Sequence, residues 1–186
     1  MTEAGSVSHL GKVPNDEVID QIDKLGVDYE VVPCDPLLAD TAAFCEAYGY
    51  GLDESANAIV VVGKSESRTY AACLVLANTR LDVNGVVRRR LGAKKASFAS
   101  ADETIELTGM RIGGVTPFGL AGKLPIWIDS RIMDLDRVIV GGGSRARKLL
   151  VAPAALAAPA AGLFLEAVMY AGDAGPGPLK PVFHID

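Results

Sequence analysis

The sequence contains few of the residues on which several common functions depend. Its two histidines, His9 and His184, lie near the ends of the chain, which disfavours a histidine-dependent triad or metal site. Its three cysteines, Cys34, Cys45 and Cys73, are odd in number and widely separated, so they form neither a disulfide framework nor the paired spacing of a zinc site. We therefore expect free thiols in a reducing cytoplasm, and a site that uses no metal and no cofactor.

The chain also lacks long apolar runs and a basic excess. No run approaches the roughly 20 apolar residues that span a bilayer, and the polar N-terminal residues do not form a signal peptide. A net charge of −5 argues against binding nucleic acid through bulk electrostatics, and no DNA partner is expected. We expect a soluble cytoplasmic protein, with basic side chains concentrated only around residues 88–95 and 145–148.

The length and composition predict a single domain. A chain of 186 residues, 49% of them apolar, can bury one sizeable core. Residues 1–13 and the Gly- and Pro-rich residues 171–186 are expected to be tails, with the domain between them at residues 14–170.

Short helices and short strands alternate irregularly along this domain. Ser100 and Glu103 have the spacing of a capping box, and Asp82 is placed to cap another helix. Helices are predicted at residues 14–25, 41–48, 82–91, 100–108 and 163–170. Strands are predicted at residues 29–33, 58–62, 69–76, 96–99, 126–128, 138–140 and 149–151. This order favours a mixed α/β fold, with a mixed sheet curled into a partial barrel and short helices around it.

The sequence Gly63-Lys64-Ser65 matches part of the motif of a phosphate-binding loop. Lys64 follows four β-branched residues in the order Gly-Lys-Ser, but a P-loop requires glycine where Ala58 stands and a flexible loop where residues 59–62 favour a strand. The P-loop interpretation is therefore rejected. Lys64 is then either a solvated residue in the loop of the hairpin formed by residues 58–76, or a functional residue with partners elsewhere.

Residues 108–119 contain four glycines and one proline. The pair Gly113 and Gly114 permits unusual backbone shapes, which can direct successive amide groups at one oxygen as in an oxyanion hole. The same composition also suits a tight turn between a helix and a strand. The composition alone leaves both interpretations open.

Two further features have similar alternatives. Residues 140–145 (Val-Gly-Gly-Gly-Ser-Arg) follow a strand and either bind a phosphate or form a hairpin turn with solvated arginines. They lack the glycine order and the following helix of a dinucleotide site. Asp129, after the strand at residues 126–128, is either a functional carboxylate or a turn former.

In this order and spacing, these stretches resemble the YbaK family of aminoacyl-tRNA deacylases, which is related to the editing domain of bacterial prolyl-tRNA synthetase. The resemblance extends from about Pro14 to Leu156. It rests on Lys64 after an apolar strand, and on the segments at residues 108–119, 125–129 (Pro-Ile-Trp-Ile-Asp), 141–145 and 151–153 (Val-Ala-Pro).

The resemblance implies hydrolysis of the ester of mischarged aminoacyl-tRNA, free-standing and in trans, with an aminoacyl-tRNA synthetase as a further potential partner. It matches Lys64 to the essential lysine of the family and, with Gly113 and Gly114, assigns it a catalytic role. It assigns substrate binding to Val115, Thr116, Pro117, Asp129, Gly143, Ser144 and Arg145. Arg145, Arg147 and Lys148 are expected to grip the acceptor end. The alternative is a non-catalytic module of the same fold that binds a tRNA end or a nucleotide.

Overall fold

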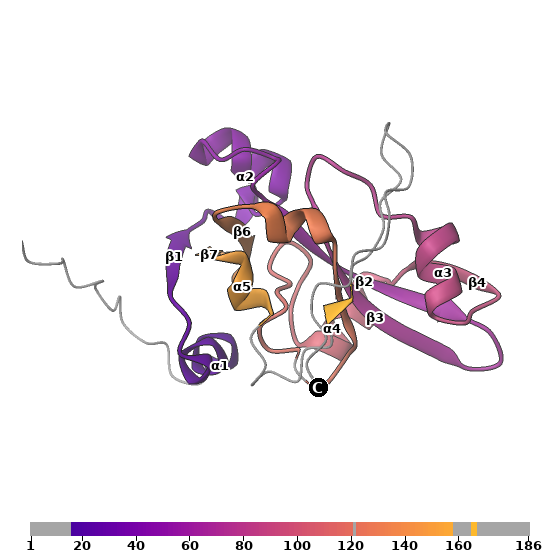
Figure 1. Cartoon of the computed structure of the whole chain (residues 1–186). Helices are drawn as coiled ribbons and strands as arrows, with labels where there is room; N and C mark the ends of the chain where they lie inside the picture. Colours follow the sequence, from indigo (N-terminus) through magenta and orange to yellow (C-terminus); the bar gives the residue numbers. More distant parts are fainter. Residues whose placement is uncertain (1–15, 121, 158–164, 167–186) are drawn as a thin grey trace, which may run out of the picture.

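The computed structural model describes residues 16–120, 122–157 and 165–166. They form a mixed α/β fold, which confirms the predicted class (Figure 1). The strands are β1 (Tyr29–Pro33), β2 (Ala56–Lys64), β3 (Arg68–Leu76), β4 (Lys95–Phe98), β5 (Ile126–Ile128), β6 (Val138–Gly141), β7 (Arg147–Val151) and β8 (Leu165–Glu166). The helical segments are α1 (Glu17–Leu25), η1 (Pro36–Leu38), α2 (Thr41–Tyr48), η2 (Val83–Val87), α3 (Arg88–Arg90), α4 (Ala101–Thr108), η3 (Ser130–Asp134) and α5 (Pro153–Leu156).

The described strands form two separate sheets. One has the order β1-β7-β6 and the other the order β4-β2-β3-β5-β8. An isolated bridge between Ser55 and Ile139 joins their margins. Neither described sheet closes on itself, so no closed barrel forms and the predicted partial barrel is not confirmed.

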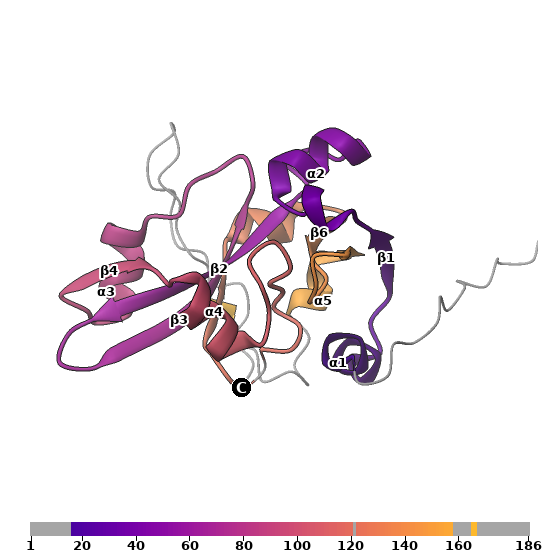
Figure 2. The same ribbon diagram turned by 180° about the vertical axis from the view of Figure 1, so that it is seen from behind.

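The hairpin of β2 and β3 is longer than its apolar residues predicted. The antiparallel pairing runs from Ala56 opposite Leu76 to Lys64 opposite Arg68, which leaves only residues 65–67 as the loop. Lys64 is therefore the last residue of a strand and not the first of a loop. Both views show the end of this hairpin projecting away from β1, β6 and α2 (Figures 1 and 2).

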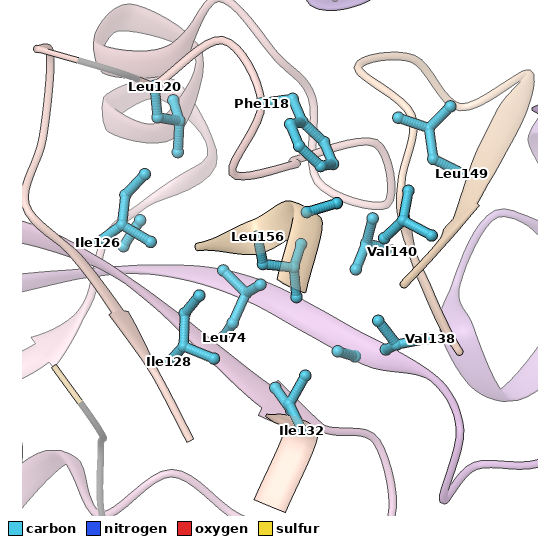
Figure 3. Close-up of a cluster of buried hydrophobic side chains, with 14 of the residues drawn as sticks. Leu74, Phe118, Leu120, Ile126, Ile128, Ile132, Val138, Val140, Leu149 and Leu156 are labelled. Carbon is cyan, nitrogen blue, oxygen red and sulfur yellow. The ribbon is translucent and has the colours of Figure 1, made fainter. Parts of the chain in front are cut away.

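The main core lies between the two sheets. Leu74, Ile126 and Ile128 from the five-stranded sheet cluster with Val140 and Leu149 from the three-stranded one (Figure 3). Burying such aliphatic side chains contributes about 1.5–3 kcal/mol each before chain entropy is counted. Phe118 joins the same cluster and so anchors residues 108–119, called the Gly-rich loop from here on, to the core.

Most predicted elements are present, with local differences. The capping box of Ser100 and Glu103 is formed, and Asp82 caps a segment that begins with a π turn before α3. The helix predicted at residues 163–170 is wrong for its two described residues, which form β8 beside β5. The rest of that segment and the predicted tails, residues 1–13 and 171–186, lie outside the described residues. No helix in the described part of the chain is long and apolar enough to cross a membrane.

Candidate active site

The Gly-rich loop and the β6–β7 turn lie in backbone contact. A Cβ atom added at Gly141 would lie 2.0 Å from the carbonyl oxygen of Val115, and one at Gly114 would lie 2.6 Å from the carbonyl carbon of Ser144. Real Cβ atoms do not approach backbone atoms so closely, and backbone cannot rotate aside as a side chain can. Glycine at these two positions therefore allows the two segments to meet.

Three successive carbonyl groups of the loop face the β6–β7 segment. Arg145 Nη1 donates to the oxygen of Ile112 at 2.8 Å, and the Gly143 amide donates to the oxygen of Gly114 at 2.8 Å. Between them, Lys148 Nζ donates to the oxygen of Gly113 at 2.8 Å. Each carbonyl in the loop is thus fixed by a donor from one side.

The amide groups of the loop consequently face the other side, because the N–H and C=O of a trans peptide point in opposite directions. The Gly114 amide donates to the oxygen of Arg111 at 2.9 Å, so it is used within the turn and is not the free donor that the sequence suggested. The amides of Gly113 and Val115 donate to no acceptor among the described residues. These two N–H groups remain as donors for a ligand.

Thr116 adds a hydroxyl group to the same loop. The residue is fully buried, and its Oγ1 has no hydrogen-bond partner within the described residues. Buried polar groups in native proteins are nearly always paired, since leaving one unpaired costs about 1–3 kcal/mol. This unpaired hydroxyl directly follows Val115 in the sequence, which makes the loop a candidate site for an oxygen-rich group.

Lys148 differs most from its predicted place in an exposed basic patch. It lies in the middle strand β7 with 4% of its surface exposed, and its Nζ donates to the oxygens of Ala39 at 2.6 Å and Gly113 at 2.8 Å. Its Nζ also lies 5.5 Å from the centre of the Phe44 ring. Extending the predicted strand at residues 149–151 back to Arg147, where β7 begins, would have placed Lys148 on the same face as Leu150. Leu150 packs against the buried cluster that contains Phe44.

The ammonium group of Lys148 is shielded from water. Burial is the main cause that lowers its pKa below the usual 10.5, and the nearby Arg145 lowers it further, whereas Cys34, Asp40 and Cys45 oppose the shift. An ammonium group has three donors, and two are used on carbonyl oxygens. Lys148 thus ties the Gly-rich loop to the turn before α2.

Arg145 and Arg147 also serve the framework of the site. Arg145 Nε donates to the oxygen of Pro36 at 2.9 Å, which joins η1 to the loop. Arg147 donates to the oxygen of Gly142 at 2.6 Å. It also pairs with Asp16, and the hydrogen bond between these two side chains is the main cause that lowers the pKa of Asp16. The expected basic patch for a tRNA end is therefore not an exposed surface, because these cations are occupied by the protein.

The N-terminus of α2 and the start of β2 lie beside this framework. Thr41 lies two residues after Ala39, whose carbonyl oxygen Lys148 binds. The Thr41 hydroxyl donates to the side-chain oxygen of Asn57. The structure gathers most of the predicted site residues in the two touching segments: Gly113, Gly114, Val115, Thr116, Pro117, Gly143, Ser144 and Arg145.

Two predicted site residues lie elsewhere. Lys64 is seven residues beyond Asn57 on β2, about 23 Å along an extended strand. It lies opposite Arg68 and Lys95 and not beside Gly113. Asp129 is buried after β5, where its carboxylate accepts from the amide and guanidinium of Arg131 at 3.0–3.1 Å and caps η3. Its contacts are those of a turn former.

Residues 35–158 match the model of the aminoacyl-tRNA editing domain. The chain belongs to this family. The match confirms the resemblance to YbaK-family editing domains, and it includes both touching segments of the site together with Lys148.

Curated relatives agree with the family. The multifunctional Ser/Thr-tRNA deacylase ProXp-y of Escherichia coli K12 is 26% identical over 135 residues, which cover 72% of this chain and 80% of that protein. The uncharacterized protein YwhH of Bacillus subtilis 168 is 28% identical over 108 residues, 58% of this chain and 66% of YwhH. The chain thus spans just under two thirds of the length of YwhH.

Solved structures share the fold. A protein proposed to be a trans-editing enzyme for prolyl-tRNA synthetase superposes with a TM-score of 0.70 at 24% identity, covering 87% of this chain and all of that one. At this identity the likeness establishes the fold alone.

Proposed function

We propose that this chain is a free-standing aminoacyl-tRNA deacylase that hydrolyses, in trans, the ester of a mischarged tRNA for proline or a related tRNA. Membership of the editing-domain family supports this class of reaction. The relative named as a Ser/Thr-tRNA deacylase supports seryl and threonyl esters as the first substrates to examine. A synthetase pocket excludes a similar side chain by only a modest factor, which is why such editing is needed.

One observation carries the proposal, namely the division of the Gly-rich loop into a bound carbonyl side and a free amide side. Attack of water on an ester develops negative charge on the former carbonyl oxygen, and preorganised N–H donors stabilise that charge. The amides of Gly113 and Val115 are such donors. The guanidinium on the Ile112 carbonyl polarises the peptide that carries the Gly113 amide, which strengthens it as a donor.

The remaining residues bind and position the substrate. The Thr116 hydroxyl donates to an oxygen of the aminoacyl group or the terminal ribose. Pro117 follows it in the loop, and Gly143 and Ser144 border the loop at Gly114. Lys148 is a positioning residue that holds the Gly113 carbonyl. Arg145 acts in the same way through Ile112, and Asp129 keeps the turn after β5 in place.

An activated ester then needs little besides orientation and charge stabilisation. Water adds to the ester carbonyl, the bond to the ribose oxygen breaks, and the free amino acid and a tRNA with a free hydroxyl are released. The proton of the water passes to the substrate, through the neighbouring ribose hydroxyl to the leaving oxygen. Lys64, remote along β2, takes no part in this step.

The test is deacylation of alanyl-, cysteinyl-, seryl- and threonyl-tRNA for proline by wild type and by Thr116→Val. We expect wild type to cleave at least one ester, and Thr116→Val to cleave it about tenfold more slowly, since a lost hydrogen bond costs about 1.4 kcal/mol. The unfolding free energy of this variant should be unchanged or higher, because an unpaired buried hydroxyl is removed.

Thr104→Val is the matched control. The Thr104 hydroxyl is also buried, but it donates to the oxygen of Ser100 at 2.8 Å. This control should lose about 1 kcal/mol of stability and keep its kcat. If wild type cleaves no ester above the spontaneous rate, the deacylase proposal fails in favour of a non-catalytic module that binds a tRNA end.

A further inference from the structure

Three cations form a row across the projecting end of the hairpin. Lys64 on β2 lies directly opposite Arg68 on β3 and directly opposite Lys95 on β4. Residues directly opposite in antiparallel strands point to the same face of the sheet, and neighbouring strands lie about 4.8 Å apart. These three exposed side chains, which we call the basic row, therefore lie side by side on one face.

The basic row lowers the stability of the five-stranded sheet. Like charges directly opposite one another destabilise a sheet. Arg68 pairs with Glu103 on α4, but neither Lys64 nor Lys95 makes an ion pair with any described residue. Lys94 adds a further exposed cation, while Glu66 is the only acidic residue of the hairpin loop at residues 65–67. In a protein of net charge −5, this concentration of positive charge, with Lys64 and Lys95 outside any ion pair among the described residues, points to an anionic partner.

The position of the basic row suits one partner in particular. The row lies about 23 Å along β2 from Asn57. Asn57 is hydrogen-bonded to Thr41, which lies two residues after Ala39, and Lys148 binds the carbonyl oxygens of both Ala39 and Gly113. In both views the hairpin extends away from β6 and α2 (Figures 1 and 2). A tRNA carries its ester on a short single-stranded end that follows a duplex stem, so an ester held at the loop leaves stem phosphates at a distance from it.

We propose that the basic row binds phosphates of the acceptor stem of the tRNA whose ester lies at the Gly-rich loop. This inference rests on the proposed function. Lysine binds phosphate as a point charge without reading the base sequence, so the row supplies affinity and register and not choice of tRNA. It gives Lys64 a role that fits its position.

Binding of uncharged tRNA tests the basic row directly. We would compare wild type, the double variant Lys64→Ala with Lys95→Ala, and a matched control that also removes two exposed lysines, Lys24→Ala with Lys123→Ala. Fluorescence anisotropy gives Kd between 50 and 200 mM salt. Each lost phosphate contact should lower the slope of log Kd against log salt by roughly 0.7–0.9, so the double variant should lose about 1.5 and the control none.

Deacylation adds a second measurement. With full-length mischarged tRNA, the double variant should raise KM about tenfold at low salt, whereas hydrolysis of the same amino acid on a CCA trinucleotide should be unaffected. The variant Lys64→Arg with Lys95→Arg should restore the wild-type salt slope, because charge and not shape is required.

The outcomes separate this inference from the proposed function. If the double variant keeps the slope of the control, the inference is overturned. It is also overturned if the double variant loses binding to anionic lipid vesicles but not to tRNA. If the slope falls as expected while wild type cleaves no ester, the basic row stands and the deacylase proposal fails.

Discussion

Basic side chains serve opposite purposes in two regions of this molecule. Beside the three-stranded sheet, Arg145 and Lys148 donate hydrogen bonds to carbonyl oxygens of the protein. At the end of the hairpin, Lys64 and Lys95 are exposed and make no ion pair with any described residue. The first region shapes a site, whereas the second is free to meet an anion from outside.

Burial therefore determines whether a cation bonds to the protein's own backbone or is available to an external anion. A buried ammonium must be bonded, because an unpaired charge away from water is too costly, so it acts on the backbone around it. An exposed ammonium keeps its hydration and can exchange it for a phosphate. Removing a buried cation should therefore disturb the chemical step, and removing an exposed one should disturb only the encounter with a long substrate.

Replacing Lys148 should have the largest effect. Lys148→Met keeps the length of the side chain but leaves the carbonyl groups of Ala39 and Gly113 without their donor. Misplacement of the loop should lower kcat about 100-fold, on full-length tRNA and on the CCA trinucleotide alike. The control Lys123→Met, at an exposed site, should leave both substrates unaffected.

The pH dependence of kcat distinguishes a positioning role of Lys148 from a purely structural one. Its lowered pKa means that wild-type kcat should fall as pH rises through a value below 10.5. Lys148→Arg keeps its charge and should recover part of kcat without this alkaline loss. An unchanged kcat in Lys148→Met, with the protein folded, would contradict the role of Lys148.

Adding a methyl group between the two segments of the site should have the next largest effect. The Cβ of Gly141→Ala would meet the backbone of Val115, which cannot rotate aside. We expect a loss of about 1–3 kcal/mol of unfolding free energy in urea, together with a strongly reduced kcat because the loop is displaced.

Gly26→Ala is the matched control for this change. Gly26 has a φ of 64° with nothing near its missing Cβ, so the substitution strains only the backbone at the end of α1. It should cost about 1 kcal/mol and leave kcat intact. Equal kcat values for the two variants would show that the contact between the loop and the β6–β7 turn is not needed.

The smallest effect is expected at the ion pair that fastens α1 to β7. Asp16→Asn removes the charge that pairs with Arg147 and retains a good helix cap at the same position. Wild type should be more stable by about 1–2 kcal/mol at pH 7. Urea titrations of both proteins across pH measure this difference.

The sign of the pH dependence follows from the lowered pKa of Asp16. A carboxyl group with a lowered pKa in the folded state contributes its full stability above its unfolded pKa near 3.8. That contribution is lost as the pH falls through the lower, folded pKa. The difference between wild type and Asp16→Asn should therefore stay constant from pH 7 to about pH 4 and shrink below it; a constant difference down to pH 2 would argue against this ion pair.

The sequence predicted the local structure well because its signals are local. Capping at Asp82 and Ser100, the hairpin of β2 and β3, and the glycine stops after helices each depend on a few neighbouring residues. The Gly-rich loop and the β6–β7 turn were also found from composition. The mixed class was correct, whereas the partial barrel was not confirmed, because sheet closure depends on pairings between distant strands.

The roles of single cations could not be obtained in this way. A Gly-Lys-Ser order drew attention to Lys64, but the length of β2 carries that residue away from the loop. Lys148 looked like part of an exposed basic cluster until the strand β7 placed it against Ala39 and Gly113, residues distant in the sequence.

Most of the helices, strands and glycine loops could be located from the sequence, which also carries the order of motifs that marks an aminoacyl-tRNA editing domain. Those properties follow from local backbone preference and local spacing. The folded arrangement of the described residues was needed to see which loop carbonyls are bound, which loop amides have no acceptor, and which lysine is buried. These depend on contacts between residues about 29 to 109 positions apart, and burial, which sets the cost of a charge, exists only once the chain has folded.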